Sequence, residues 1–150
     1  MIWKPDVTVA AVLETEGRFL LVEEITQQGL RFNQPAGHLE ESESLLDASV
    51  RETLEESGYI YAPQAVLGIY QWKSPEKTFL RFAFTGTIIS HDPDRRLDEG
   101  IIRAIWLTPE EIREKPCRSP MVLQCVEDYL ADRRYPLDII NHYPIQKEQA

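Results

Sequence analysis

The sequence predicts an α+β fold in which a mixed β-sheet lies between helices. Apolar runs rich in β-branched and aromatic residues form two groups of three predicted strands, and one helix-like segment separates the groups. Two further helix-like segments follow the second group. This order of β-β-β-α-β-β-β-α-α is typical of α+β domains. With 150 residues and no linker, repeat or low-complexity segment, the chain is expected to form one domain, 1–150.

The first three strands are predicted at 7–13, 18–23 and 30–33. Residues 7–13 are almost continuously apolar, which is typical of a central strand. Because Gly17 ends a short polar turn, the second segment is expected to return beside the first as the other arm of a hairpin. After the third segment, Gly37 allows a tight turn and a close approach of the backbone to a ligand.

Helix-end signals and further apolar runs predict the remaining elements. A helix is expected over 44–57, because Gly58 is a natural residue to end it. Two later helices are predicted where a hydroxyl residue is followed directly by proline, a combination that favours a first helical turn. These helices begin at Thr108 and at Ser119, the last one running to Asp132, and the remaining strands are predicted at 66–72, 79–89 and 101–107.

The helix at 44–57 carries carboxylates that stability alone does not explain. Glu52, Glu55 and Glu56 crowd one helix face, and each like-charged pair at these spacings costs about 0.2–0.5 kcal/mol. They also lie in the last turns before Gly58, where the helix dipole is already negative. A solvated acidic face is the usual interpretation of such a run. The alternative is a hard divalent cation, whose oxygen ligands would be these acids.

The spacing of the surrounding residues separates the two interpretations. Residues 37–58 read G-x5-E-x7-R-E-x-x-E-E-x-G. This pattern resembles the signature of the Nudix hydrolases, which cleave diphosphate linkages with magnesium or manganese. The resemblance covers most of the chain and implies a Nudix-type α/β/α sandwich. Thr53 and Tyr59 depart from the family pattern, which has aliphatic residues at these two packing positions.

The resemblance also implies a set of site residues. Glu52, Glu55 and Glu56, together with the carbonyl of Gly37, would hold Mg²⁺ or Mn²⁺, for which carboxylate and carbonyl oxygens are suitable ligands. The same three acids are the expected catalytic residues, since the metal that they hold would activate a water molecule.

Two further roles follow from the family pattern. Glu43 and Arg51 would pair and brace the turn against the helix, which matters because the orientation of ligands controls metal affinity. The general base has two candidate sources. One is a helix carboxylate, and the other is an acid in the loop before the last strand, here Asp98 or Glu99.

A narrower resemblance, to the NudJ phosphatase branch, implies a substrate class. That branch removes one phosphate from nucleoside triphosphates and diphosphates and from a thiamine-precursor pyrimidine pyrophosphate. Trp72 would stack on a flat heterocycle, and Gln71 would hydrogen-bond to the edge of that ring. Arg81 and Arg118 would donate hydrogen bonds to phosphate oxygens. Core packing of the tryptophan and surface ion pairs of the arginines are the alternatives. The segments that carry this resemblance are 33–40, 71–72, 80–82, 118–120 and 134–137.

Composition limits the partners and the compartment. The net charge of −9 argues against nucleic-acid binding, so the expected partner is a small nucleotide or pyrophosphate. No apolar run approaches the roughly 18 residues that span a bilayer, and the first residues show no signal-peptide pattern, so no membrane partner is expected. The only two cysteines, Cys117 and Cys125, are expected to be free thiols in a reducing cytoplasm.

Other functions compete with phosphate-releasing hydrolysis. Another Nudix activity, such as cleavage of ADP-ribose or of an oxidised nucleotide, would use the same helix acids. A non-catalytic Nudix-fold nucleotide sensor is a further alternative, although such sensors usually lose the signature carboxylates that this chain keeps. A purely structural acidic protein would have to tolerate dipole-opposed carboxylates without metal.

Overall fold

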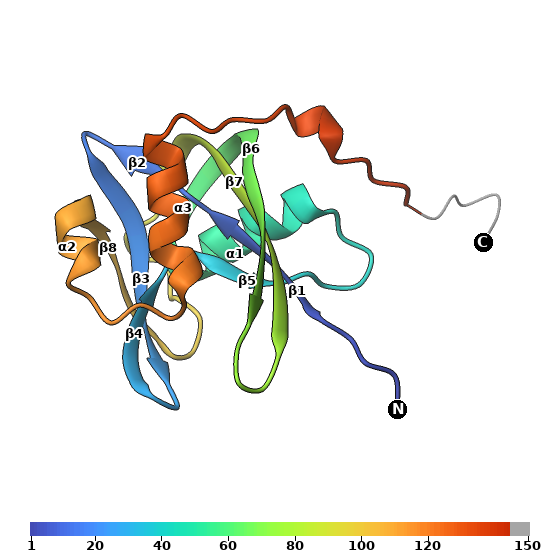
Figure 1. The fold of residues 1–150 in the computed structure, drawn as a ribbon. Coiled ribbons are helices and arrows are strands. Elements are labelled where there is room, and N and C mark those ends of the chain that lie inside the picture. Colours follow the sequence, from blue (N-terminus) through green and yellow to red (C-terminus); the bar gives the residue numbers. More distant parts are fainter. Residues whose placement is uncertain (145–150) are drawn as a thin grey trace.

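The structure, a computed structural model, describes residues 1–144 and contains two four-stranded sheets (Figure 1). The first sheet has the order β5-β1-β7-β6, in which β1 and β7 are parallel and the other neighbours are antiparallel. The sheet is therefore mixed, and the α+β prediction is confirmed. Its strands are β1 (Asp6–Ala11), β5 (Ala36–His38), β6 (Tyr59–Lys73) and β7 (Thr78–His91).

The second sheet is built around β3, which pairs antiparallel with each of its neighbours. It leans against the first sheet, and apolar side chains of both sheets meet in the core, as Phe19 and Leu21 do with Leu67 and Ala83. Its strands are β2 (Glu14–Thr15), β3 (Arg18–Thr26), β4 (Gly29–Asn33) and β8 (Ile101–Leu107).

Helices α1 and α3 pack on opposite faces of the first sheet (Figure 1). Ala48 of α1 packs against Val9, Val66 and Phe84, whereas α3 joins the core between the two sheets through Val122 and its neighbours. Each helix begins at a residue whose side-chain oxygen accepts from a free backbone N–H, as the sequence indicates. The helices are α1 (Leu45–Ser57), α2 (Pro109–Arg113) and α3 (Pro120–Leu130), followed by a 3₁₀ turn at Leu137–Ile139.

The predicted hairpin between residues 7–13 and 18–23 is wrong. β1 pairs with β5 and β7, whereas β3 lies in the other sheet. The polar turn does form, but its incoming arm is short: Glu14 and Thr15 of β2 pair with the start of β3, and the Leu20 N–H donates to the Leu13 carbonyl at 3.0 Å. The chain crosses between the sheets at Val12, whose N–H still bonds to β7 at 2.8 Å. β1 is apolar on both faces because helix and sheet cover it.

Besides β2, which the prediction treats as part of a turn, two strands differ from the sequence-based prediction. β6 starts at Tyr59, directly after the helix-ending Gly58, rather than at residue 66. It contains Pro63, which is tolerated because β6 is the last strand in the sheet order and its register shifts there. The short strand β5 is absent from the prediction, because three residues give too little periodicity. Among residues 1–144, none of the helices has the length and apolar character that crossing a membrane requires.

Candidate active site

Helix α1 turns acids as well as small residues toward the sheets. Its N-cap Ser44 accepts a hydrogen bond from the Asp47 N–H at 3.0 Å, and Gly58 ends it in the left-handed conformation at a φ of 78°. The buried side chains include Glu52, which is 9% exposed, and Thr53. Helix geometry thus places a carboxylate on the face that packs on the protein.

Gly37 is required by the position of the Glu52 carboxylate. Gly37 lies on β5, opposite Val9 of β1, and its φ is not in the left-handed region. A Cβ atom added at Gly37 would overlap the Glu52 carboxylate. The absence of a side chain therefore lets the acid of α1 approach the backbone of the turn directly.

Arg51 connects the turn and three acids. It makes a two-point ion pair with Glu43, with Nε–Oε2 and Nη2–Oε1 distances of 3.0 and 2.7 Å. Its Nη1 donates to Glu52 at 2.7 Å and to Glu55 at 2.9 Å, and its Nη2 donates to the His38 carbonyl at 3.1 Å. The Arg51 guanidinium also holds the pKa of Glu43 below its usual range. The structure thus brings together the pair that the family pattern implies.

Three carboxylates converge near the C-terminal end of α1. Glu52, Glu55 and Asp98 each offer an oxygen within 4.8 Å of the others. The Asp98 N–H donates to the Glu55 carbonyl at 3.0 Å, which holds the loop against the helix. Among the described residues this group contains Asp98 and not Glu99. Of the two loop acids considered from the sequence, only Asp98 meets the helix acids, and the choice of Glu99 as a catalytic residue is not supported.

Glu56 is a partly buried acid of the site. Its Oε1 accepts the Ala36 N–H at 3.0 Å, and burial, followed by the nearby Glu52, raises its pKa to about 8. The pKa of Glu52 is also raised, by burial and by the adjacent Glu55. These acids carry more negative charge than Arg51 compensates. Because all donors are oxygens and their charge is under-compensated, the residues present fit a hard divalent cation.

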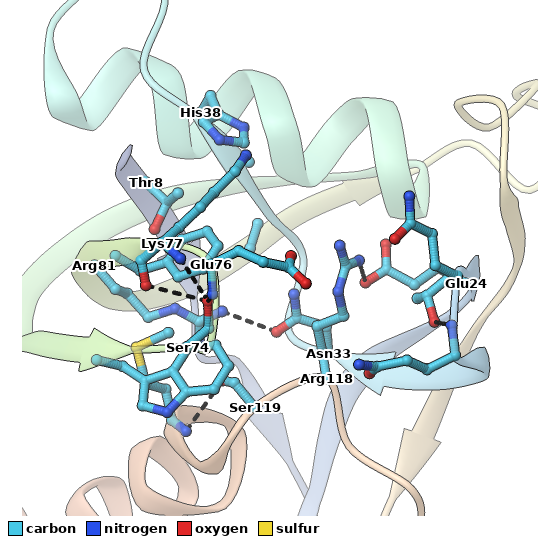
Figure 2. Close-up of a pocket in the computed structure, with 18 of the residues that line it drawn as sticks. Thr8, Glu24, Asn33, His38, Ser74, Glu76, Lys77, Arg81, Arg118 and Ser119 are labelled. Carbon is cyan, nitrogen blue, oxygen red and sulfur yellow. Dashed lines mark hydrogen bonds and ion pairs between the residues drawn. The ribbon is translucent and has the colours of Figure 1, made fainter. Parts of the chain in front are cut away.

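A cavity of about 740 Å³ opens beside the acids, between the two sheets and the start of α3 (Figure 2). Glu52 and Glu56 line it together with Trp72, Arg81 and Arg118. Other polar residues complete its wall, and Asn33, His38 and Ser119 among them belong to segments that carry the narrower resemblance. The polar residues of the wall include Thr8, Glu24, Asn33, Glu76, Lys77 and Ser119.

The four predicted substrate-binding residues have different environments. Trp72 stacks on Phe79, with ring centroids 5.6 Å apart and planes 18° apart. Arg118 pairs with Glu24 at 2.6 Å, as a surface arginine would. Gln71 is exposed and lies outside the cavity, because alternate residues of a strand point to opposite faces and Trp72 points inward. Its predicted role in reading the ring is therefore not supported.

Comparison with known proteins identifies the family. A family model described as the NUDIX domain matches residues 3–125. The chain belongs to the Nudix family. It is 41% identical over 143 residues to the phosphatase NudJ of Escherichia coli strain K12 and of Shigella boydii serotype 4, covering 94% of this chain and 94% of each relative. The resemblance stated from the sequence is thus confirmed.

Solved structures agree with this assignment. A Nudix hydrolase from Nitrosomonas europaea is 52% identical, with a TM-score of 0.90 over 93% of this chain and 98% of that one. The Nudix domain of Shewanella oneidensis NrtR, solved with ADP ribose, is only 17% identical and has a TM-score of 0.74 over 87% of this chain and 90% of that one, so it shows the fold alone. With these relatives, the chain is a Nudix hydrolase similar to the NudJ phosphatases.

Proposed function

We propose that this Nudix hydrolase cleaves phosphoanhydride bonds of nucleoside triphosphates and diphosphates and of related organic pyrophosphates, and that it releases orthophosphate. A thiamine-precursor pyrimidine pyrophosphate belongs to the same substrate class. The observation that carries the proposal is the convergence of Glu52, Glu55 and Asp98 beside a cavity of about 740 Å³. The cavity has room for a nucleotide-sized ligand and carries polar and aromatic side chains.

The residues that would hold a divalent cation are Glu52, Glu55, Glu56 and the carbonyl of Gly37, with Asp98 as an addition from the loop. The proposed cation is Mg²⁺ or Mn²⁺. When bound, it would neutralise phosphate charge and lower the pKa of a coordinated water. This donor set explains why acids crowd the negative end of α1, an arrangement that costs stability without a cation.

The remaining roles belong to the chain itself. Arg51 keeps Glu52 and Glu55 in fixed positions through hydrogen bonds of 2.7 and 2.9 Å, and its two-point pair with Glu43 holds Arg51 in turn. Asp98 faces the helix acids and is more solvent-accessible than Glu52, so we assign the acceptance of a proton from the attacking water to Asp98 Oδ or to Glu55 Oε. Trp72 offers its ring face to a heterocycle.

A substrate panel tests the proposal. Wild-type protein is incubated with nucleoside triphosphates, nucleoside diphosphates, the pyrimidine pyrophosphate and ADP-ribose, with Mg²⁺ and with excess chelator, and the products are identified by phosphorus NMR. We expect Mg²⁺-dependent release of orthophosphate from the first three substrates. Pyrophosphate as the main product from triphosphates, or preferred cleavage of ADP-ribose, would replace this proposal by another Nudix activity.

The predicted cytoplasmic location rests on the two free cysteines.

A further inference from the structure

One buried cation of the cavity has no counter-ion in the described part of the chain. Arg81 on β7 is 3% exposed, and its Nη1 and Nη2 donate to the amide oxygens of Gln34 at 2.8 Å and Asn33 at 2.9 Å. Its Nε is buried and has no acceptor among residues 1–144. A charge that is taken out of water without a partner is strongly unfavourable. The amide oxygens are neutral, so the charge of the guanidinium is left uncompensated in a residue that lines the cavity.

Hydrogen-bond chemistry fixes how the neighbours of Arg81 are oriented. Arginine has donors only, so Asn33 must turn its carbonyl oxygen toward Arg81, which leaves the Asn33 amino group for another acceptor. Thr8 is the register partner of Arg81 on β1 and adds a hydroxyl to the same wall. Figure 2 shows Asn33 between Arg81 and Arg118, with Thr8 on the other side of Arg81. This end of the cavity is rich in donors.

Aromatic surface lies on the same face of the sheet as Arg81. Phe79 is two residues before Arg81 on β7, and its register partner Trp72 stacks on it. Arg81 is separated from the turn at His38 by one intervening strand, because Thr8 pairs with both residues. Two strand spacings amount to roughly 10 Å between the backbones. The backbone of Arg81 is thus two strands away from the backbone of the turn that carries Gly37 and His38.

We propose that Arg81 and Asn33 determine specificity by binding an acceptor edge of the substrate heterocycle, a ring carbonyl or a ring nitrogen, while Trp72 contacts the face of the ring. The proposal rests on the proposed function, because it assumes that the diphosphate lies at the acid cluster. It assigns to Arg81 the ring-reading role expected of Gln71. The proposal places Arg81 on the heterocycle rather than on phosphate, because Asn33 and Thr8 beside it add uncharged hydrogen-bonding groups that match the edge of a ring.

The change Asn33→Asp tests this role without removing Arg81. The aspartate has the shape of asparagine, gives the guanidinium a carboxylate at the 2.9 Å contact, and removes the amino donor of Asn33. The ligand-free variant should unfold at a higher Tm, because the buried charge gains a partner. The same change should weaken binding of a heterocycle, because Arg81 is then neutralised and a donor is lost.

Calorimetry of the full chain with Mg²⁺ measures this binding without turnover. The probes are the α,β-methylene analogues of adenosine and cytidine diphosphate, and the ring-free control is methylenediphosphonate. Asn33→Asp should raise the Kd of both nucleotide analogues by about 10–100-fold, the range for a lost charge-assisted hydrogen bond, and change that of the ring-free ligand less than about twofold. Gln64→Glu adds the same charge at an exposed position of β6 and controls for net charge.

Each other outcome overturns the inference. If Asn33→Asp raises the Kd of the ring-free ligand as much as that of the nucleotide analogues, Arg81 binds phosphate. If the variant has a higher Tm and an unchanged Kd for the nucleotide analogues, Arg81 has a purely structural role. If Asn33→Asp does not fold, Arg81→Lys gives the same comparison, since lysine keeps the charge and loses the planar donors. Binding is measured apart from hydrolysis, so a wild type that binds the analogues and cleaves no substrate refutes the proposed function alone.

Discussion

Gly37→Ala should remove an acid from the proposed metal site without unfolding the protein. The backbone at Gly37 is not in the left-handed region, so alanine is compatible with its conformation. The new Cβ overlaps the carboxylate of Glu52 and would also lie 2.9 Å from its Cγ. Because the overlap involves the end of a flexible side chain, Glu52 can rotate away, and the backbone of β5 need not move.

The structure sets the size of both effects. Rotation breaks the 2.7 Å contact between Glu52 and Arg51 but leaves the two-point pair of Arg51 with Glu43 intact. It also moves the Glu52 carboxylate out of a buried site that raises its pKa, which offsets the lost contact. The free energy of unfolding of the metal-free protein should therefore change by no more than about 1 kcal/mol. Mg²⁺ affinity should fall by at least about 10–100-fold, the cost of disturbing groups that orient metal ligands.

Calorimetric Mg²⁺ titration and thermal unfolding in chelator give the two readouts. Gly68→Ala is the matched control, because its Cβ also meets the end of a side chain, Tyr70 Oη at 2.9 Å, on a strand outside the acid cluster. Glu52→Gln provides the benchmark for a lost ligand charge. Wild-type Mg²⁺ affinity in Gly37→Ala, together with an unchanged Tm, would refute the reasoning that this glycine exists to admit the Glu52 carboxylate.

Three further results are expected. Burial raises the pKa of Glu56 from 4.5 to about 8, so this group stabilises the metal-free fold at low pH, and the free energy of unfolding should fall by up to about 5 kcal/mol between pH 4.5 and pH 8. Urea unfolding in chelator should show a flatter pH profile for Glu56→Gln, and parallel profiles would contradict this assignment. Arg51→Ala should lower turnover and weaken Mg²⁺ affinity together by about 10–100-fold. If the variant and the wild type reach half-saturation at the same Mg²⁺ concentration, Arg51 does not brace the metal site. Trp72→Ala should raise KM for heterocyclic substrates by roughly 5–100-fold in steady-state kinetics. An equal rise in KM for a ring-free diphosphate would contradict the stacking role.

Local signals in the sequence are enough to predict the helix that carries the site. Ser44 and Gly58 mark the ends of α1, and the spacing of Glu52, Glu55 and Glu56 together with Gly37, Glu43 and Arg51 predicts a metal site through the family resemblance. The fold adds that Glu52 faces the buried side of the helix. Helical periodicity alone favours the face of Leu46, Val50 and Leu54, which is only half-buried.

The failures have a common physical origin in long-range contacts. The parallel pairing of β1 with β7 joins residues more than 70 positions apart, such as Asp6 and Phe79, and leaves no local pattern. The sequence names Arg81 as a candidate substrate-binding residue, but its burial depends on the amides of Gln34 and Asn33, which are 47 and 48 positions away and leave no local pattern. Which of Asp98 and Glu99 meets the helix acids follows from how the loop lies against α1, where the Asp98 N–H donates to the Glu55 carbonyl, and this contact leaves no local pattern.

The most direct test of a metal-dependent active site is one Mg²⁺ titration read out in two ways. Heat of binding is measured by calorimetry, and orthophosphate release from a nucleoside diphosphate is measured over the same Mg²⁺ concentrations. If the cluster of Glu52, Glu55 and Asp98 holds the catalytic cation, both curves should have the same midpoint, and Glu52→Gln should shift or abolish both. Hydrolysis that continues in excess chelator, or a Glu52→Gln variant with wild-type curves, would contradict the account.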